Sequence, residues 1–134
     1  MTQTQTPETE QLERNKATVA AFYRHAIVGK DFEAARALVG PTYTQHDPRI
    51  TDGLEGLAQF IDSIKRDFPD LTVEVKRLVA EGNYVVGHFH GIRVPGQAGT
   101  AIVDIFRLKD TRIVEHWDVM QPIPEEAAND NTMF

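Results

Sequence analysis

The sequence predicts an α+β fold in which a curved, mainly antiparallel sheet wraps around three N-terminal helices. In the first half of the chain, apolar residues recur at spacings of three and four, which is the pattern of amphipathic helices. After Pro69 the spacing changes to two, which is typical of strands with one buried face. Because the helices come first and an antiparallel meander follows, we expect the concave face of the sheet to pack on the helices. A cone-shaped cavity at one end would then be the natural ligand site.

The first two predicted helices occupy the N-terminal part of the chain. The first begins near Pro7, because proline is tolerated in the first turn, and ends at Gly29. Its apolar side consists of Leu12, Val19, Phe22, Tyr23, Ala26 and Ile27. Asp31 is expected to cap a second, short helix that runs through Val39 and stops at the Gly-Pro pair 40–41.

The polar segment 42–49 is expected to form a short strand that leads into a loop. The third helix follows, with Asp52 and Glu55 in the spacing of a capping box and Pro69 at its end. Its apolar stripe consists of Leu54, Leu57, Phe60, Ile61, Ile64 and Phe68. The later segments are expected to be strands at 71–79, at 84–92 and within 101–121, with a bulge at 77–79, a turn at 81–83 and a loop at 95–99.

The last two strands, within residues 101–121, carry acidic and imidazole groups where a core strand should be apolar. Side chains alternate between the two faces of a strand, so Asp104 and Phe106 share one face, as do His116 and Asp118. If the turn at 109–112 is a three-residue loop, these two faces coincide. A two-residue loop would instead place Asp104 opposite Trp117. We favour the first register, which brings two carboxylates and an imidazole onto one partly buried wall.

Length and composition indicate a single domain over residues 1–134, with a core at about 8–124 and tails at 1–6 and 125–134. We expect the N-terminal tail to be disordered and the C-terminal one to wrap the surface or a partner chain. The net charge of −6 argues against nucleic acid or an anionic membrane as partner. There is no apolar run long enough to span a bilayer, and the N-terminus does not resemble a signal peptide. Because the sequence has no cysteine, it has no disulfide, thiolate nucleophile or Cys-ligated zinc, and we expect a cytoplasmic protein.

The histidines extend the candidate site beyond the last two strands. His88 and His90 lie two positions apart on one strand and therefore point the same way. With His46 and the acidic wall (Asp104, His116 and Asp118), they are expected to form one polar patch in an otherwise apolar cone. A carboxylate there would be desolvated, which raises its pKa and makes it a competent base near neutral pH. A neighbouring imidazole would orient it or donate a hydrogen bond to a developing enolate oxygen.

Other side chains take supporting roles in this interpretation. Tyr43 and Gln45 would supply further hydrogen-bond donors, and Phe106 an apolar wall. Trp117 should face away from the patch in the favoured register, which suits contact with a partner chain. In the other register it becomes a pocket wall for an aromatic substrate.

Two alternatives accompany this site. In the first, Asp104 is a buried structural carboxylate paired with His116 or with an arginine, and not a catalytic group. Alternatively, His88 and His90 with Asp104 or His116 match a two-histidine-one-carboxylate metal site, although this spacing is short and degenerate. We expect no metal and no organic cofactor. The sequence has no nucleophile elbow, P-loop or dinucleotide-binding fingerprint.

The chain resembles a known family in several motifs. The segment 104–107, a short turn and the run 113–118 (Ile-Val-Glu-His-Trp-Asp) closely resemble the SnoaL-like polyketide cyclases of the nuclear transport factor 2-like (ketosteroid isomerase-like) superfamily. Also similar are Tyr43-x-Gln45-His46, Phe68-Pro69-Asp70 and the Glu81-Gly82-Asn83 turn. The resemblance covers about residues 12–124 and implies a cone-shaped, cystatin-like α+β barrel. It also implies cofactor-free intramolecular aldol condensation, an activity of the lyase or isomerase type.

By motif position, this resemblance makes Asp118 the base that removes a proton α to a carbonyl. A polar residue, often histidine, lies fourteen positions earlier in the family, and that residue is Asp104 here. This is a departure, because a carboxyl group donates a hydrogen bond only when it is protonated. Two close carboxylates share a proton, so a protonated Asp104 would still act as donor, and His88, His90 or His116 are alternatives.

Three functions follow from the sequence. The first is an SnoaL-like enzyme that acts on a small carbonyl or polyketide-like substrate by acid–base chemistry. The second is a non-catalytic small-molecule-binding or dimerisation module of the same fold, because this fold does not determine function. The third is a metal-dependent enzyme that uses His88 and His90. In each case we expect a homodimer or a higher homo-oligomer.

Overall fold

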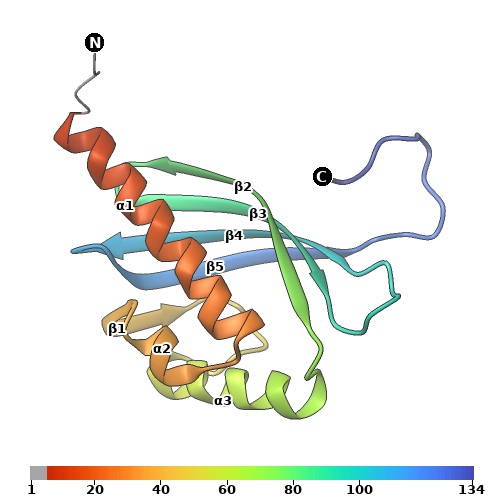
Figure 1. The fold of residues 1–134 in the computed structure, drawn as a ribbon, viewed down its shortest axis with the longest axis horizontal. Coiled ribbons are helices and arrows are strands. Elements are labelled where there is room, and N and C mark those ends of the chain that lie inside the picture. Colours follow the sequence, from red (N-terminus) through yellow and green to blue (C-terminus); the bar gives the residue numbers. More distant parts are fainter. Residues whose placement is uncertain (1–5) are drawn as a thin grey trace.

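A computed structural model describes residues 6–134 of the chain and confirms the predicted α+β fold (Figure 1). Residues 1–5, most of the predicted N-terminal tail, lie outside the described part. The elements are α1 (Pro7–Phe22), η1 (Tyr23–Val28), α2 (Phe32–Arg36), β1 (Val39–Gln45), α3 (Gly53–Asp67), β2 (Thr72–Glu81), β3 (Tyr84–Ile92), β4 (Thr100–Lys109) and β5 (Arg112–Pro122). Within residues 6–134, no helix has both the length and the apolar character that a membrane crossing needs.

The first helix begins and ends as predicted. Thr6 caps it, because its Oγ1 accepts a hydrogen bond from the Thr9 N–H at 3.1 Å. The helix then continues into η1, a single π-helical segment that ends at Gly29. Such segments are rare and often lie at functional sites. Here the segment contributes Tyr23 and Ile27 to the wall of the cavity described below.

The second helix is shorter than predicted. Asp31 caps α2 through a bond from the Ala34 N–H at 3.1 Å, but the helix ends at Arg36. The predicted helix end at Val39 is wrong, because Val39 begins β1, which pairs in parallel with β5. Pairing with a strand supplies the backbone of this segment with the hydrogen bonds that a longer helix would otherwise have provided.

The third helix ends at Asp67, just before Pro69, as predicted, but its capping box does not form. Asp52 occupies the N-cap position of α3 without a side-chain hydrogen bond to the helix. Its Oδ1 instead accepts the Gln45 N–H at 2.8 Å. This bond ties the start of α3 to the end of β1.

The five strands form one sheet in the order β1-β5-β4-β3-β2, in which only the β1–β5 pair is parallel. Figure 1 shows α1 lying across one face of this sheet, with α2 and α3 near β1. The core between them is aromatic. Tyr23 stacks on Phe89 with 4.0 Å between ring centroids, and Phe22 packs edge-on against Phe106 at 6.0 Å.

The β4–β5 hairpin reaches the predicted register by an unpredicted route. Its loop is Asp110-Thr111, both with positive φ, so the three-residue loop is wrong. Two positive φ angles are typical of a two-residue type I′ turn. One extra residue on β5, Val114, then forms a bulge between two register positions. Beyond this bulge Asp104 lies opposite Asp118, as favoured from the sequence.

The two remaining irregular features are a second bulge and the C-terminal tail. On β2, one extra residue, Lys76, lies just before the predicted bulge segment 77–79. After β5 the tail turns back toward the sheet (Figure 1), and its last residue contacts the outer side of β3. There the Phe134 ring stacks on His90 at 4.5 Å, and the Lys76 ammonium lies 5.2 Å from its centroid.

Candidate active site

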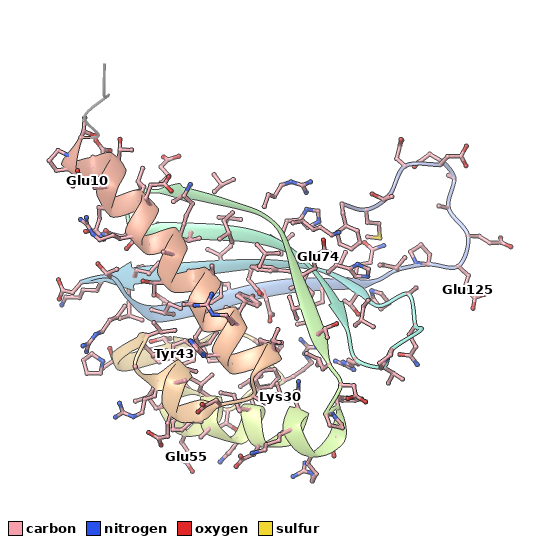
Figure 2. The ribbon with its side chains drawn as sticks, viewed as in Figure 1. Glu10, Lys30, Tyr43, Glu55, Glu74 and Glu125 are labelled. Atoms are coloured by element: carbon pink, nitrogen blue, oxygen red, sulfur yellow. The ribbon has the colours of Figure 1, made fainter. Side chains whose placement is uncertain are left out.

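A cavity of about 270 Å³ lies between the helices and the concave face of the sheet. Most of its wall is apolar and includes Phe22, Tyr23, Leu57, Phe60, Ile64 and Ile102. Its polar wall comes mainly from β1, β4, β5 and the loop after β1. Figure 2 shows Tyr43 inside the molecule, whereas Glu10, Glu55 and Glu125 lie at its periphery. The cavity is therefore a mainly apolar pocket whose polar groups are concentrated in one region, as is common for ligand sites.

The inner faces of β4 and β5 bring the predicted acidic wall together. Asp104, His116 and Asp118 all line the cavity, because each lies on the inward side of the strand alternation. Asp104 is only 4% exposed and His116 8% exposed. Phe106 lies beside them, with its ring centroid 4.9 Å from that of His116. The expectation that these residues share one partly buried wall is confirmed in its geometry.

The hydrogen bonds of Gln45 determine the tautomer of His116. The backbone N–H of Asp47, which can only donate, bonds to Gln45 Oε1 at 3.0 Å. The same oxygen lies 2.8 Å from His116 Nδ1, so Nδ1 must carry a proton. His116 Nε2 faces Asp104 Oδ1 at 3.1 Å. One further proton is thus shared between this nitrogen and the Asp104 carboxyl group.

Burial acts on Asp104 and Tyr43 in the same direction. Burial raises the pKa of Asp104, and the hydrogen bond and charge of His116 oppose this only in part. Burial also raises the pKa of Tyr43, which therefore keeps its proton at neutral pH. The Tyr43 hydroxyl oxygen accepts a bond from Gln45 Nε2 at 3.2 Å. Its own proton remains available to a ligand, since no bond donated by this hydroxyl exists within residues 6–134.

Asp118 has a second acidic partner that the sequence interpretation did not include. Its carboxyl group is hydrogen-bonded to that of Asp47, which is 2% exposed. Burial first, and then this hydrogen bond, raise the pKa of Asp118 to about 7. Burial alone would also raise the pKa of Asp47, but hydrogen bonds from Arg49 and Asp118 outweigh it and hold this pKa well below its usual value.

Arg49 keeps Asp47 ionised by a two-pronged contact. Its Nε and Nη2 donate to the two Asp47 oxygens at 3.1 Å and 2.8 Å, and its backbone N–H donates to Oδ1 at 2.9 Å. Such bidentate, charge-assisted bonds are among the strongest in proteins. The pair lies in the loop between β1 and α3, and its only sequence signal is opposite charge two positions apart directly after a strand.

The structure does not bring His88 and His90 into the polar patch, so that part of the expectation is wrong. The inward face of β3 carries Val85, Gly87, Phe89 and Gly91, and all four are buried. Asp104 pairs with Gly87, whereas His88 pairs with Val103 on the outer side. The two histidines therefore contact Phe134 of the tail and not the cavity. Their predicted metal site with Asp104 or His116 is likewise excluded by this geometry.

His46 and Trp117 also lie outside the cavity. We expected both among the residues that contact substrate, Trp117 in the alternative register only. The His46 ring stacks on Trp117 with 4.7 Å between centroids and an interplanar angle of 4°. Its Nε2 is 2.7 Å from Glu115 Oε2, and Arg107 Nε donates to the other oxygen of this carboxylate at 2.8 Å. The prediction that Trp117 faces away from the acidic wall is confirmed.

The acidic wall has a geometry that also suits a cation. One ligand atom each from Asp104, His116 and Asp118 lies within 4.8 Å of the others. The Nδ1–H of His116 bonds to the Gln45 carbonyl, and metal-binding histidines usually direct their second nitrogen at such an acceptor. These three residues fit a divalent metal as well as they fit proton transfer.

This cone of helices and sheet, with acids on its inner wall, defines a nuclear transport factor 2-like fold. Residues 19–116 match the family of the SnoaL-like domain, so the chain belongs to that family. This match confirms the resemblance to SnoaL-like proteins that the sequence motifs indicated. No curated protein sequence matches the chain.

Three solved structures illustrate the likeness. TsrD from Streptomyces laurentii is 22% identical with a TM-score of 0.68, covering 81% of this chain and 88% of that one. IdmH from Streptomyces antibioticus is 25% identical with a TM-score of 0.63, covering 79% and 91%. An SnoaL-like protein of unknown function from Burkholderia thailandensis is 17% identical with a TM-score of 0.69, covering 81% and 96%.

Proposed function

We propose that this protein is an enzyme that abstracts a proton α to a carbonyl and directs the enolate to aldol-type ring closure, without a cofactor. One observation carries the proposal: carboxyl groups and an imidazole converge on the wall of an otherwise apolar cavity. The family supports the same direction, since IdmH bears the provisional description of a polyketide cyclase. The enzyme class would be a lyase or isomerase of the aldol-condensing type.

In this mechanism Asp118 is the general base. A base works best when its pKa lies near the working pH, because it is then largely free yet still binds a proton well. The pKa of about 7 for Asp118 meets this requirement. Arg49 holds Asp47 in place, and the ionised Asp47 gives a proton on Asp118 a hydrogen-bond acceptor. The proton taken from the substrate carbon therefore has a defined place to reside.

The enolate oxygen needs a donor, and Tyr43 supplies the best one. Its hydroxyl lines the cavity, keeps its proton and already accepts from Gln45, so its proton is directed elsewhere. The shared proton of Asp104 and His116 is a second source, on the same wall. Donors fixed in place before the reaction stabilise a developing oxyanion more effectively than water does.

The size of the cavity limits the substrate. About 270 Å³ lies just below the usual range for small-molecule sites, which is roughly 300–1,000 Å³. We therefore propose a small carbonyl compound of one or two rings' bulk and not a large, fused polyketide. Asp104 also supports a substrate other than the usual polyketide of the family. It stands where the family more often has another polar residue, so a different group faces the substrate.

The test is exchange of the protons next to a ketone. The wild-type protein in D₂O should replace the α-protons of 3-(4-acetylphenyl)propionate or its amide by deuterium, seen as loss of the acetyl methyl signal in proton NMR. It should also close a linear diketone whose carbonyls are spaced for a six-membered ring. Asp118→Asn should slow exchange by about a hundredfold to ten-thousandfold with the fold intact.

Asp110→Asn is the matched control. Asp110 is exposed in the β4–β5 turn with a φ of 53°, a conformation that asparagine tolerates. The Asp110→Asn substitution makes the same chemical change outside the cavity, so the rate of α-proton exchange should be unaltered. If Asp118→Asn exchanges protons as fast as wild type, the proposed mechanism is wrong. A ligand that binds and is always recovered unchanged would instead favour a non-catalytic binding module.

A metal-dependent enzyme is the second candidate, because Asp104, His116 and Asp118 fit a divalent cation. It predicts stoichiometric metal in protein purified without an affinity tag. It also predicts that a chelator abolishes turnover and that Mn²⁺ or Zn²⁺ restores it. Full activity in metal-free protein would exclude this candidate.

We also propose that two copies associate through the outer face of the sheet. One exposed valine stands there on each of four consecutive strands, Val79 on β2 (61% exposed), Val86 on β3, Val103 on β4 and Val119 on β5 (74% exposed). Exposed apolar side chains on neighbouring strands favour association with another surface. The outer face of a second copy would present the same apolar side chains.

A further inference from the structure

Only two cationic side chains line the cavity of the described chain, Arg49 and Arg93. Arg49 is already engaged by the Asp47 carboxylate. The Arg93 guanidinium lies 5.2 Å from the centroid of the Phe68 ring. Across residues 6–134, no carboxylate lies within ion-pair distance of Arg93. The cavity therefore has one positive charge whose partner is not supplied by the protein around it.

Arg93 lies at the end of the cavity away from the acidic wall. It follows β3 two residues after Gly91, so it continues the inward side of that strand. Gly91 pairs with Thr100, which lies four residues before Asp104 on β4. Four strand residues span about 13 Å. A ligand that reaches from one end to the other must be elongated.

The wall between these ends is apolar and includes Phe60, Phe68 and Ile102. An apolar ligand body fits there, and its ends would meet opposite electrostatic environments. Carboxyl groups at the Asp118 end disfavour an anion but accept a proton, whereas the guanidinium at the other end favours an anion. The Thr100 hydroxyl lines the cavity next to that end and offers a further donor.

We propose that Arg93 is a specificity-determining residue that binds the carboxylate of an elongated keto acid whose reacting carbonyl lies at Asp118. The keto part of this substrate class rests on the proposed function, whereas the anion preference rests on the cavity alone. The cation–π contact with Phe68 holds the guanidinium at the cavity wall, and its N–H groups would receive the carboxylate in the two-pronged manner that arginine favours.

The experiment compares a charged and a neutral probe of equal size by calorimetric titration of the full-length protein. The probes are 3-(4-acetylphenyl)propionate and its amide, in which a benzene ring separates the reacting acetyl group from the carboxyl end. Wild type should bind the acid about tenfold more tightly than the amide. Arg93→Gln should remove this preference by weakening the binding of the acid alone. Arg93→Lys should retain part of the preference, because lysine keeps the positive charge. Arg36→Gln is the control, because Arg36 is exposed on α2, lies outside the cavity and makes the same change in net charge.

Binding separates this proposal from the proposed chemistry. If wild type prefers the acid, Arg93→Gln does not, and neither probe exchanges its α-protons, the anion site stands and the proton-transfer function fails. If α-protons exchange but both probes bind equally well, the function stands and the role of Arg93 is overturned. Failure of wild type to bind either probe, or an unchanged preference in Arg93→Gln, also overturns it.

Discussion

On β5, His116 faces the cavity, and the next residue, Trp117, faces the outside of the sheet. Each side has a histidine bonded to a carboxylate. His116 is buried with Asp104 and has its second nitrogen fixed by Gln45, whereas the side chain of His46 is 41% exposed and stacks on Trp117. The same pair of functional groups thus forms a proton-sharing site on one face and a surface contact on the other.

The difference teaches that residue identity alone does not locate the chemistry in this fold. Water screens the outer pair, so its contribution to stability is small and its protons exchange with solvent. On the inner face, burial raises the pKa of Asp104 and Asp118 and leaves few places for a proton to go. Proton transfer becomes a controlled event only there.

The largest expected effect concerns packing. Val85 is fully buried and Val86 is 39% exposed, although they are neighbours on β3. Val85→Ala should lower the free energy of unfolding by about 2–3 kcal/mol, because it removes two buried carbons and leaves a cavity. Val86→Ala should cost less than about 1 kcal/mol. Urea denaturation of both variants tests this, and equal losses would show that the inner and outer faces are not distinguished by burial.

The two histidines provide the next comparison. His116→Gln should slow α-proton exchange by about tenfold to a hundredfold, because it removes the group that shares a proton with Asp104. His46→Gln should leave the rate unaltered, since His46 does not line the cavity. Both variants should be checked for an unchanged circular dichroism spectrum. A comparable loss in the two would mean that the outer face takes part in the reaction.

A third prediction concerns pH. In wild type the ionised base is active, so the exchange rate should rise as pH increases through about 7, the pKa of Asp118. Asp47→Asn removes the neighbouring negative charge, and this lowers the pKa of Asp118 toward its ordinary value. The rising limb should therefore move to lower pH. Carbon NMR titration of the Asp118 carboxyl group measures the same shift without turnover, and an unmoved or raised pKa would contradict the coupling.

The smallest effect should come from the outer face. Val119→Lys places a charge at a residue that is 74% exposed, so the monomer should keep its stability. If two copies associate there, sedimentation velocity should show a shift toward monomer at equal concentration. Wild type that stays monomeric throughout the accessible concentration range would remove the proposed dimer.

The sequence predicted the α+β order and the inward position of Asp104, His116 and Asp118. The periodicity of apolar residues is a local property of the sequence, so it can be read without knowledge of tertiary contacts. The reason given for the register was nevertheless wrong, because a three-residue loop and a two-residue loop plus a bulge leave Asp104 facing the same residue. Only the positive φ angles of the turn and the extra residue Val114 distinguish them.

Other parts of the site were beyond local patterns. On β3, alternation shows that His88 and His90 share a face but not which face is buried. The glycines that flank Phe89 were an available signal, because a Cβ at Gly87 would lie 2.2 Å from the Phe89 ring. The Asp47–Arg49 pair lies in a loop, whose path depends on the surrounding fold. Its contact with Asp118 joins residues 71 positions apart and has no local signature.

The bulge at Val114, and not composition, determines which side chains of β5 enter the cavity. If Val114 instead paired regularly with Arg107 while the Asp110-Thr111 turn was kept, every later residue of the strand would change sides. Asp104 would then lie opposite Trp117, the indole would fill the hollow, and the proposed base would point into solvent. Loss of this local distortion would thus turn the reactive wall inside out while leaving every residue in the chain. Deletion of Val114 itself, by contrast, would remove the bulge and keep Asp104 opposite Asp118.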